Sequence, residues 1–329
     1  MEIGIIGAGA LGGTFAALLD RVGHRVEVTA RGDGLAAIRS AGIRLTGAYG
    51  DVTARVTANE RLTRRPELVL VCTKAQDAEA AVAANRALVD GATVVVVQNG
   101  LEGVDTAERL LPSSTCLGLL SLIAADHSGP GLVHVTAAAE SGLGRGDGPA
   151  GQTAVRIAEV LSEAVPVRAI DDFRGAQWTK LVVNMVNAVP AIVGVTLGEV
   201  VAHPGLLRTL TASMHECVRV GIARGVRFGS LNGLDDTGLR AFASSSLEDA
   251  TSVPSDLVAR MGWETNRGST QQSLRRGQPT EIDFLNGAVV REATAAGLAA
   301  PVNAALVGLV HEVESLGHPL PADRVIDLR

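Results

Sequence analysis

The segment from Ala176 to Gly194 is almost wholly apolar, yet it carries one lysine and two asparagines. At about 100° per residue of helix, Lys180, Asn184 and Asn187 lie at about 0°, 40° and −20°, so they form one narrow polar stripe. A partly desolvated lysine has a pKa lowered toward neutrality, and its ammonium group can stabilise negative charge on an oxygen atom and donate a proton to it. The alternative is a lysine that snorkels to solvent near the helix start. The two asparagines on the same face favour a proton donor.

A glycine-rich segment, "GAGALGG", directly follows the apolar run Ile3 to Ile6 and precedes a helical pattern. In this context the spacing G-x-G-x-x-G indicates a dinucleotide-binding domain, because such domains carry it at a strand-to-helix turn. The first glycine permits the turn, the second lets the backbone approach a pyrophosphate, and the third lets the helix pack closely. Free N–H groups at the helix N-terminus then bind the anion. The alternative is a glycine-rich turn without a ligand. The predicted cofactor contacts are Gly7, Ala8, Gly9, Ala10, Leu11 and Gly12.

The strand "HRVEVTAR" ends about 20 residues beyond the glycines, where an NAD-binding domain usually offers an acidic residue to the ribose 2′-hydroxyl. Here that position is Arg31. A guanidinium group can bind a 2′-phosphate through two hydrogen bonds, so Arg31 favours NADP(H) over NAD(H). The alternative is a solvated arginine, with Asp33 contacting the ribose.

Further apolar strands are predicted at "ELVLVCTK" and "ATVVVVQNG", with a helical pattern between them. This alternation is typical of an α/β domain with a mostly parallel sheet covered on both faces. Ligands of such sheets lie beyond the carboxyl ends of the strands, which predicts that Lys74 and Asn99 face the cofactor. Either residue could instead only cap the following helix. We expect "TCLGLLSLIAA", "GLVHVT", "SGLGRGD" and "VPVRAI" to be additional strands of the same domain.

The strand and helix alternation stops near residue 171, and long helical patterns follow. We therefore predict an N-terminal Rossmann-type domain over residues 1–170, an all-helical domain over 171–315 and a C-terminal tail over 316–329. A helix that begins at the end of the first domain would present its polar stripe to the crevice between domains, where substrates commonly bind.

A second polar cluster lies in "NRGSTQQSLRRGQPTEIDFLNGAVVREATAAGLAAP". Thr280 to Asp283 begins an amphipathic run whose apolar side includes Leu285 and Val289. An acidic residue in a first helical turn needs no role beyond favouring the helix dipole, and Ser269 could equally be a loop residue.

Composition limits the classes of function. A net charge of −6 and an aromatic content of 2% argue against nucleic-acid binding. We expect no signal peptide, because no basic region precedes the first apolar run. We also expect no membrane segment, because the longest apolar window contains asparagines, a proline and a glutamate. Three cysteines without metal-ligand spacing indicate reduced thiols and no metal site. We expect a soluble cytoplasmic protein, and a homodimer is compatible with this sequence.

Five segments, in this order, resemble the ketopantoate reductase (2-dehydropantoate 2-reductase) family: "GIIGAGALG", "VCTKAQD", "VVVQNGLEG", "WTKLVVNMVN" and "RRGQPTEIDFLNG". The resemblance runs from residue 1 to about 315. It implies a Rossmann domain followed by a helical domain, and NADPH-dependent reduction of ketopantoate to pantoate on the route to coenzyme A.

The resemblance also implies roles for single residues. Lys180 matches the family's proton donor and Asn184 its substrate-binding partner. Ser269 and Glu281 match residues that hold the substrate carboxylate and hydroxyl. Glu281 is also a candidate catalytic residue, which either accepts a hydrogen bond from a substrate hydroxyl or orients the lysine. The matches at the cofactor and active-site cleft are Lys74, Asn99 and Ala125, with Asn99 at the substrate as well.

The sequence departs from the family pattern in the predicted substrate pocket. Many relatives carry an asparagine where this chain has Ala188, and here the asparagine is Asn187. The serine segment reads "STQQS" rather than close to Ser-Met-x-Gln-Asp. Other small 2-oxo acids therefore remain open as substrates. The rival functions are a β-hydroxyacid dehydrogenase, which shares the Lys and Asn spacing, and a non-catalytic NADP-binding redox sensor.

Overall fold

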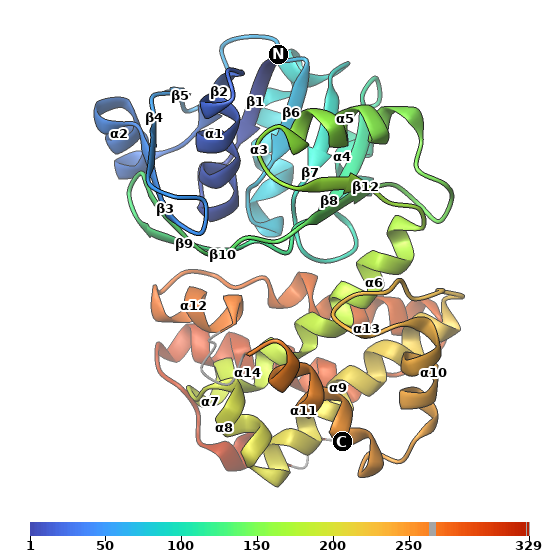
Figure 1. Ribbon diagram of the computed structural model, residues 1–329. Helices are drawn as coiled ribbons and strands as arrows, with labels where there is room; N and C mark the ends of the chain where they lie inside the picture. Colours follow the sequence, from blue (N-terminus) through green and yellow to red (C-terminus); the bar gives the residue numbers. More distant parts are fainter. Residues whose placement is uncertain (263–267, 327, 329) are drawn as a thin grey trace. The chain divides into compact units, whose positions relative to one another are not determined.

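The computed structural model describes residues 1–262, 268–326 and 328. The chain divides into two compact units, Met1–Phe173 and Arg174–Arg329, and most of their elements are labelled in Figure 1.

The first unit is built around an eight-stranded sheet of order β12-β11-β8-β7-β6-β1-β2-β5 (Figure 1). Its strands are β1 (Glu2–Ile6), β2 (Arg25–Thr29), β5 (Thr57–Asn59), β6 (Leu68–Val71), β7 (Thr93–Val96), β8 (Thr115–Leu120), β11 (Ser141–Gly144) and β12 (Val167–Ala169). All neighbours pair in parallel except β8 and β11, which are antiparallel. This confirms the predicted mostly parallel sheet.

Helices cover both faces of this sheet, because its central strands are apolar on both sides. In β6, Leu68 and Leu70 join one hydrophobic cluster, whereas Val69 and Val71 join another. Helices α1 and α5 pack in the first cluster, and α3 and α4 in the second. The helices of this unit are α1 (Ala10–Arg21), α2 (Gly32–Ala41), α3 (Ala75–Val89), α4 (Gly103–Leu110) and α5 (Gln152–Ser162).

A separate four-stranded sheet, of order β4-β3-β10-β9, packs against α1. Its strands are β3 (Ile43–Gly47), β4 (Val52–Ala54), β9 (Ala124–Gly129) and β10 (Leu132–Ala137). The segment "GLVHVT" is thus a strand of the first unit, but it does not extend the main sheet. Helix α1 approaches this second sheet closely at Gly13, where an added Cβ would lie 2.7 Å from Val133 Cγ2.

The second unit is helical, and the part of it that the structure describes contains no strand beyond an isolated bridge. Its longest helix is α9, which contacts α7, α8, α10, α11, α13 and α14. The α-helices are α6 (Phe173–Asn184), α7 (Ala188–Val193), α8 (Leu197–Ala202), α9 (Pro204–Ala223), α10 (Asp236–Ser244), α11 (Ser252–Arg260), α12 (Ser269–Arg275), α13 (Asn286–Ala295) and α14 (Pro301–Leu316). Short 3₁₀ turns are η1 (Met185–Asn187), η2 (Asp249–Thr251), η3 (Ile282–Phe284) and η4 (Ala322–Arg324).

The segment from Ala176 to Gly194 is not the single regular α-helix that the angles of its polar stripe assumed. Helix α6 ends at Asn184, a 3₁₀ turn follows, and α7 ends before Gly194, which adopts a left-handed φ of 77°. Pro190 explains the break, because it has no N–H to donate to the carbonyl of residue 186 and its ring crowds that carbonyl. A 3₁₀ turn advances about 120° per residue, which brings Asn187 to roughly the same angle as Asn184.

The segment after α14 packs onto the second unit. The Leu320 N–H donates to the Ile192 carbonyl at 2.8 Å, and the Thr209 hydroxyl donates to the Val325 carbonyl at 2.8 Å. Val325 is fully buried. Residues 327 and 329 of the predicted tail lie outside the described residues.

Candidate functional site

The glycine loop after β1 has the geometry of a nucleotide cradle. Gly7 adopts a positive φ of 99°, and its N–H donates to Thr29 Oγ1 at 3.0 Å. A Cβ at Gly12 would clash with the Gly7 carbonyl oxygen, so only glycine lets α1 start this close to β1. A Cβ at Gly9 would meet nothing within 4 Å. Gly9 thus borders open space at the N-terminus of α1, where Ala10 and Leu11 begin the helix and its first N–H groups lack helical acceptors.

The loops after β6 and β7 are tied together beside this cradle. Gln98 donates through Nε2 to the Thr73 carbonyl at 2.9 Å, and Thr73 in turn packs against Gly7. Lys74, the N-cap residue of α3, and Asn99 immediately follow the two tied residues, and both are half-buried. Because β7, β6 and β1 are neighbours in the sheet, these loops and the glycine loop form one edge. The sequence predicted that Lys74 and Asn99 follow these strand ends, but it did not predict the tie, for which the polar pair Gln98-Asn99 was the available signal.

The other two predicted cofactor residues lie on different elements. Arg31 is exposed, has extended backbone and is the N-cap residue of α2, directly beyond β2. Ala125 lies in β9 of the small sheet, where it pairs with Val135 and packs against the hydrophobic core around α1.

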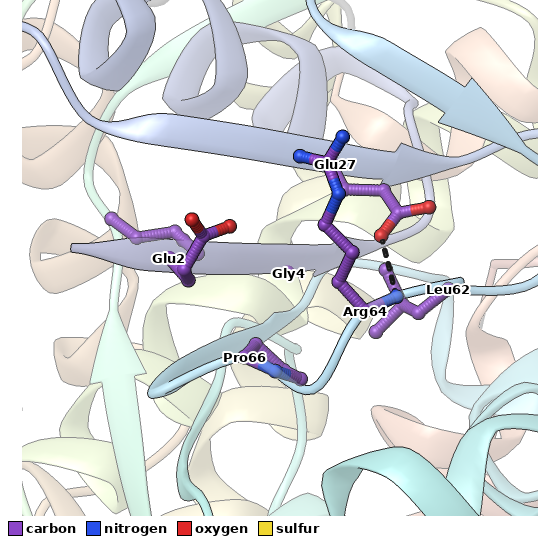
Figure 2. Close-up of a pocket in the computed structure, with 7 residues that line it drawn as sticks. Glu2, Gly4, Glu27, Leu62, Arg64 and Pro66 are labelled. Atoms are coloured by element: carbon purple, nitrogen blue, oxygen red, sulfur yellow. Dashed lines mark hydrogen bonds between the residues drawn. The ribbon is translucent and has the colours of Figure 1, made fainter.

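The one acidic residue of β2, Glu27, is committed to holding a loop. Figure 2 shows it in a small hollow with Gly4, Leu62 and Arg64. Its carboxylate accepts hydrogen bonds from Asn59 Nδ2 and from the N–H and hydroxyl of Thr63, at 2.8–2.9 Å. It also accepts from the Arg64 N–H at 3.2 Å, drawn in Figure 2. Glu27 is therefore already satisfied, and the hollow is a structural feature of the loop rather than a ribose site.

In the second unit, α6 presents Lys180 from a well-anchored helix. The preceding residue, Thr179, is buried, and its hydroxyl donates to the carbonyls of Gly175 and Gly229 at 3.0 and 2.7 Å. Trp178 is 2% exposed and packs over Gly221 of α9, which has no side chain to block the ring. These contacts fix the rotation of α6 about its axis, so that the direction of Lys180 is set by the packing of its neighbours.

Lys180 interacts electrostatically with Glu281, although the two residues lie far apart in the chain. By exposed area both residues are half-buried, but protein atoms surround the ammonium group. Burial lowers the pKa of Lys180 to about 8, and the charge of Glu281 opposes that shift. Glu281 precedes η3, and its carbonyl accepts from the N–H groups of Phe284 and Leu285. The structure therefore has an ammonium group with a pKa of about 8, low enough for a general acid, under the electrostatic influence of a carboxylate.

The polar stripe continues toward the predicted serine. Asn184 is the last residue of α6 and is half-buried, and Asn187 is 9% exposed. Asn187 presses its side-chain amide against Gly268, where an added Cβ would clash with Oδ1. Ser269 follows as the exposed first residue of α12. The polar stripe of Lys180, Asn184 and Asn187 therefore ends at Gly268, the residue before Ser269. The close fit at Gly268 was not predicted, because no pattern links that glycine to Asn187.

Two family models match almost the whole chain. The first, described as ketopantoate reductase PanE/ApbA, matches residues 3–148, and the second, its C-terminal domain, matches residues 172–314. The chain belongs to the ketopantoate reductase family. It is accordingly an oxidoreductase of a nicotinamide-dependent family that acts on CH–OH groups.

Individual members of the ketopantoate reductase family match this chain along its length. A 2-dehydropantoate 2-reductase of Archaeoglobus fulgidus is 32% identical over 319 residues, covering 95% of this chain and 98% of that protein. A ketopantoate reductase of Ralstonia eutropha, solved as a crystal structure, is 30% identical with a TM-score of 0.83, covering 96% and 99%. A D-mandelate dehydrogenase, solved with NADH and anilino(oxo)acetate, shares the fold at 20% identity and a TM-score of 0.80, covering 96% and 99%.

The residues that the structure describes contain no helix long and apolar enough to cross a membrane. They also contain no group of three or more His, Cys, Asp or Glu side chains arranged to hold a metal ion.

Proposed function

We propose that this ketopantoate reductase family member reduces 2-dehydropantoate (ketopantoate) to pantoate with NADPH. The observation that carries the proposal is the pairing of Lys180 with Glu281 inside a protein of this family. A nicotinamide held by the glycine loop would supply hydride to the keto carbon, which would place negative charge on the ketone oxygen. Lys180 donates its proton to that oxygen. Ketopantoate, NADPH and one proton thus give pantoate and NADP⁺.

The residues around Lys180 have binding roles in this proposal. Glu281 accepts a hydrogen bond from the substrate hydroxyl and favours the charged form of Lys180. Asn184 and Ser269 bind polar ends of the substrate, to which their amide and hydroxyl groups can donate. Asn99, at the edge of the first unit's sheet, contacts both substrate and cofactor.

The first unit has residues that fit a dinucleotide. The open space at Gly9 and the free helix N–H groups suit a pyrophosphate, with Gly7, Ala8, Ala10, Leu11 and Gly12 completing the cradle. The exposed guanidinium of Arg31 suits a 2′-phosphate, and Glu27 is not available to a ribose. These features support NADPH rather than NADH. Lys74 and Ala125 complete the proposed cofactor contacts.

Charge and thiols support the remaining assignments. A net charge of −6 suits a small-molecule partner rather than nucleic acid. All three cysteines are free, which fits the reducing cytoplasm where we place the reaction.

Two glycine variants separate cofactor binding from folding. Gly9→Ala should weaken NADPH binding by on the order of tenfold while leaving Tm unchanged, because the added methyl group enters empty space that the pyrophosphate needs. Gly12→Ala should lower Tm, by about 2–4 °C for each kcal/mol of strain, because its methyl group meets a carbonyl oxygen. Fluorescence titration with NADPH and thermal melting test both. Unchanged NADPH affinity in Gly9→Ala would contradict the cradle.

The pH dependence of reduction should follow Lys180. The proton donor works only when charged, and its pKa is about 8. We expect kcat/KM to be at its maximum well below that pH and to fall about tenfold per pH unit above it. A pH series at saturating NADPH checks this expectation. A flat profile through pH ~8 would show that another group supplies the proton.

A panel of 2-oxo acids tests the substrate. Ketopantoate and trimethylpyruvate differ only in the hydroxyl group that Glu281 is proposed to bind. We expect a preference of at least about tenfold for ketopantoate, since one hydrogen bond to a charged group contributes about 1.5–3 kcal/mol. The preference should shrink in Glu281→Gln, because the amide oxygen still accepts from the hydroxyl group but carries no charge. Equal rates with the two acids in the wild-type enzyme would remove the contact.

A further inference from the structure

The imidazole ring of His311 lies between two carboxylates that come from different elements. Its Nε2 is 3.0 Å from Asp283 Oδ1 in η3, and its Nδ1 is 2.7 Å from Glu314 Oε2, one turn further along α14. Both ring nitrogens thus have an acidic oxygen as partner. The ring links α14 to the turn that contains Glu281.

This arrangement requires the doubly protonated ring. An ionised carboxylate only accepts hydrogen bonds, and a neutral imidazole has only one N–H, so only the imidazolium ion satisfies both contacts. The hydrogen bond to Glu314 is the main reason that the pKa of His311 is raised, with Asp283 adding to it and burial opposing it. The charged groups that act on the ring are Asp283 and Glu314.

The same carboxylates hold the turn at both ends. Glu314 Oε1 accepts from the Thr280 N–H at 2.7 Å, before Glu281 in the chain. After Glu281, the Asp283 side chain contacts His311, and the Asp283 carbonyl accepts from Arg291 Nη1 of α13 at 2.9 Å. Thr280 is 7% exposed, so its N–H needs a protein acceptor.

The turn has little regular structure of its own. It consists of a single 3₁₀ turn, η3, whose N-cap residue is Glu281 and which has no side-chain cap hydrogen bond. Short 3₁₀ turns have poorer hydrogen-bond geometry than α-helices. The direction of the Glu281 side chain therefore depends on contacts from outside the turn. Glu314 and His311 of α14 supply one on each side of Glu281, and Arg291 of α13 adds another after it.

We propose that His311 is a positioning residue whose imidazolium ion, bound by Asp283 and Glu314, fixes the Thr280–Asp283 turn and so holds the Glu281 carboxylate beside Lys180. The contribution of this contact to turnover rests on the proposed function. The contact itself does not, and it can be measured without any substrate.

The protonation state of His311 determines whether its ring can bind Asp283 and Glu314 at the same time. Because the folded-state pKa of His311 is raised, both contacts are present below its ordinary value and one is lost as the pH rises through the raised value. An arginine at this position would keep charged donors toward both carboxylates at every pH.

The charge of Lys180 reports whether Glu281 is in place, because Glu281 raises the pKa of that lysine. Lys74 and Lys180 are the only lysines in the sequence. The rate of lysine acylation by an amine-reactive reagent can be measured across a pH series by peptide mass spectrometry. This rate gives an apparent pKa for Lys180, with Lys74 as internal reference. We expect His311→Leu to lower this value by roughly half a unit to one unit, and Glu281→Gln to lower it by at least as much.

The variants distinguish positioning from a general loss of structure. His311→Leu should add nothing in the Glu281→Gln background, and His311→Arg should keep the wild-type value. His318→Leu, which replaces an exposed histidine just beyond α14, should change neither Lys180 nor Tm. The proposal is overturned if His311→Leu leaves the pKa of Lys180 unchanged, or lowers it equally without Glu281. Failure of His311→Arg to keep the value would also overturn it, by showing that charge does not hold the turn.

Discussion

Lys180→Ala should lower kcat for ketopantoate reduction by about 100- to 10,000-fold, the range that a positioned general acid contributes. The physical reason is the loss of both the proton and the positive charge next to the oxygen that becomes negative. The affinity for NADPH should stay close to that of the wild type, because the proposed cofactor contacts lie in the first unit. Stopped-flow measurement of NADPH oxidation, with NADPH titration of the same preparation, checks both expectations.

The two lysines of the chain supply a matched control. Lys74→Ala removes the other ammonium group. Lys74 lies at the end of the loop after β6, as the N-cap residue of α3. This variant should raise KM for NADPH without moving the pH at which kcat declines. Undiminished kcat in Lys180→Ala would contradict the role of Lys180, and a fall in kcat that comes with unfolding would appear as a lower Tm.

Arg31→Ala should raise KM for NADPH by about 10- to 100-fold and leave KM for NADH nearly unchanged. A charge-assisted contact to phosphate is stronger than a neutral hydrogen bond, and its loss of about 1.5–3 kcal/mol gives this range. Arg31 is exposed directly beyond β2, and Glu27 is already satisfied by the neighbouring loop. The structure thus offers a cation at the end of β2 without a competing free carboxylate within the strand.

Arg156→Ala, an exposed arginine on α5, is the control for the loss of one positive charge. Steady-state kinetics with each cofactor should show no preference change in this variant. If Arg31→Ala weakened NADPH and NADH equally, the 2′-phosphate contact would be wrong.

Much of the fold could be predicted because strand patterns differ with their surroundings. The all-apolar run of β6 predicts a strand covered on both faces, and the structure has it at the centre of the main sheet. The alternating burial of β10 fits a sheet with one covered face, which is where it lies, whereas "GLVHVT" was assigned without deciding between sheets. The sequence predicts that these segments are strands, but it does not predict which strands pair with one another.

The site was predictable where a residue's chemistry is unusual for its surroundings. A lysine in the apolar segment before Pro190 stands out, and its lowered pKa agrees with the expectation from burial. The break of the helix follows from Pro190, although the direction it gives to Asn187 does not follow from α-helical periodicity. The contact between Asn187 and Gly268 depends on two segments that meet only in the folded unit, and no local pattern shows it.

The identity of the product tests the central claim most directly. The protein should be mixed with NADPH and excess ketopantoate, and the products followed by absorbance and NMR spectroscopy. Our account predicts that pantoate forms in a 1:1 ratio to oxidised NADPH. NADPH that binds but is not consumed, under conditions where the protein is folded, would contradict it and favour a non-catalytic sensor.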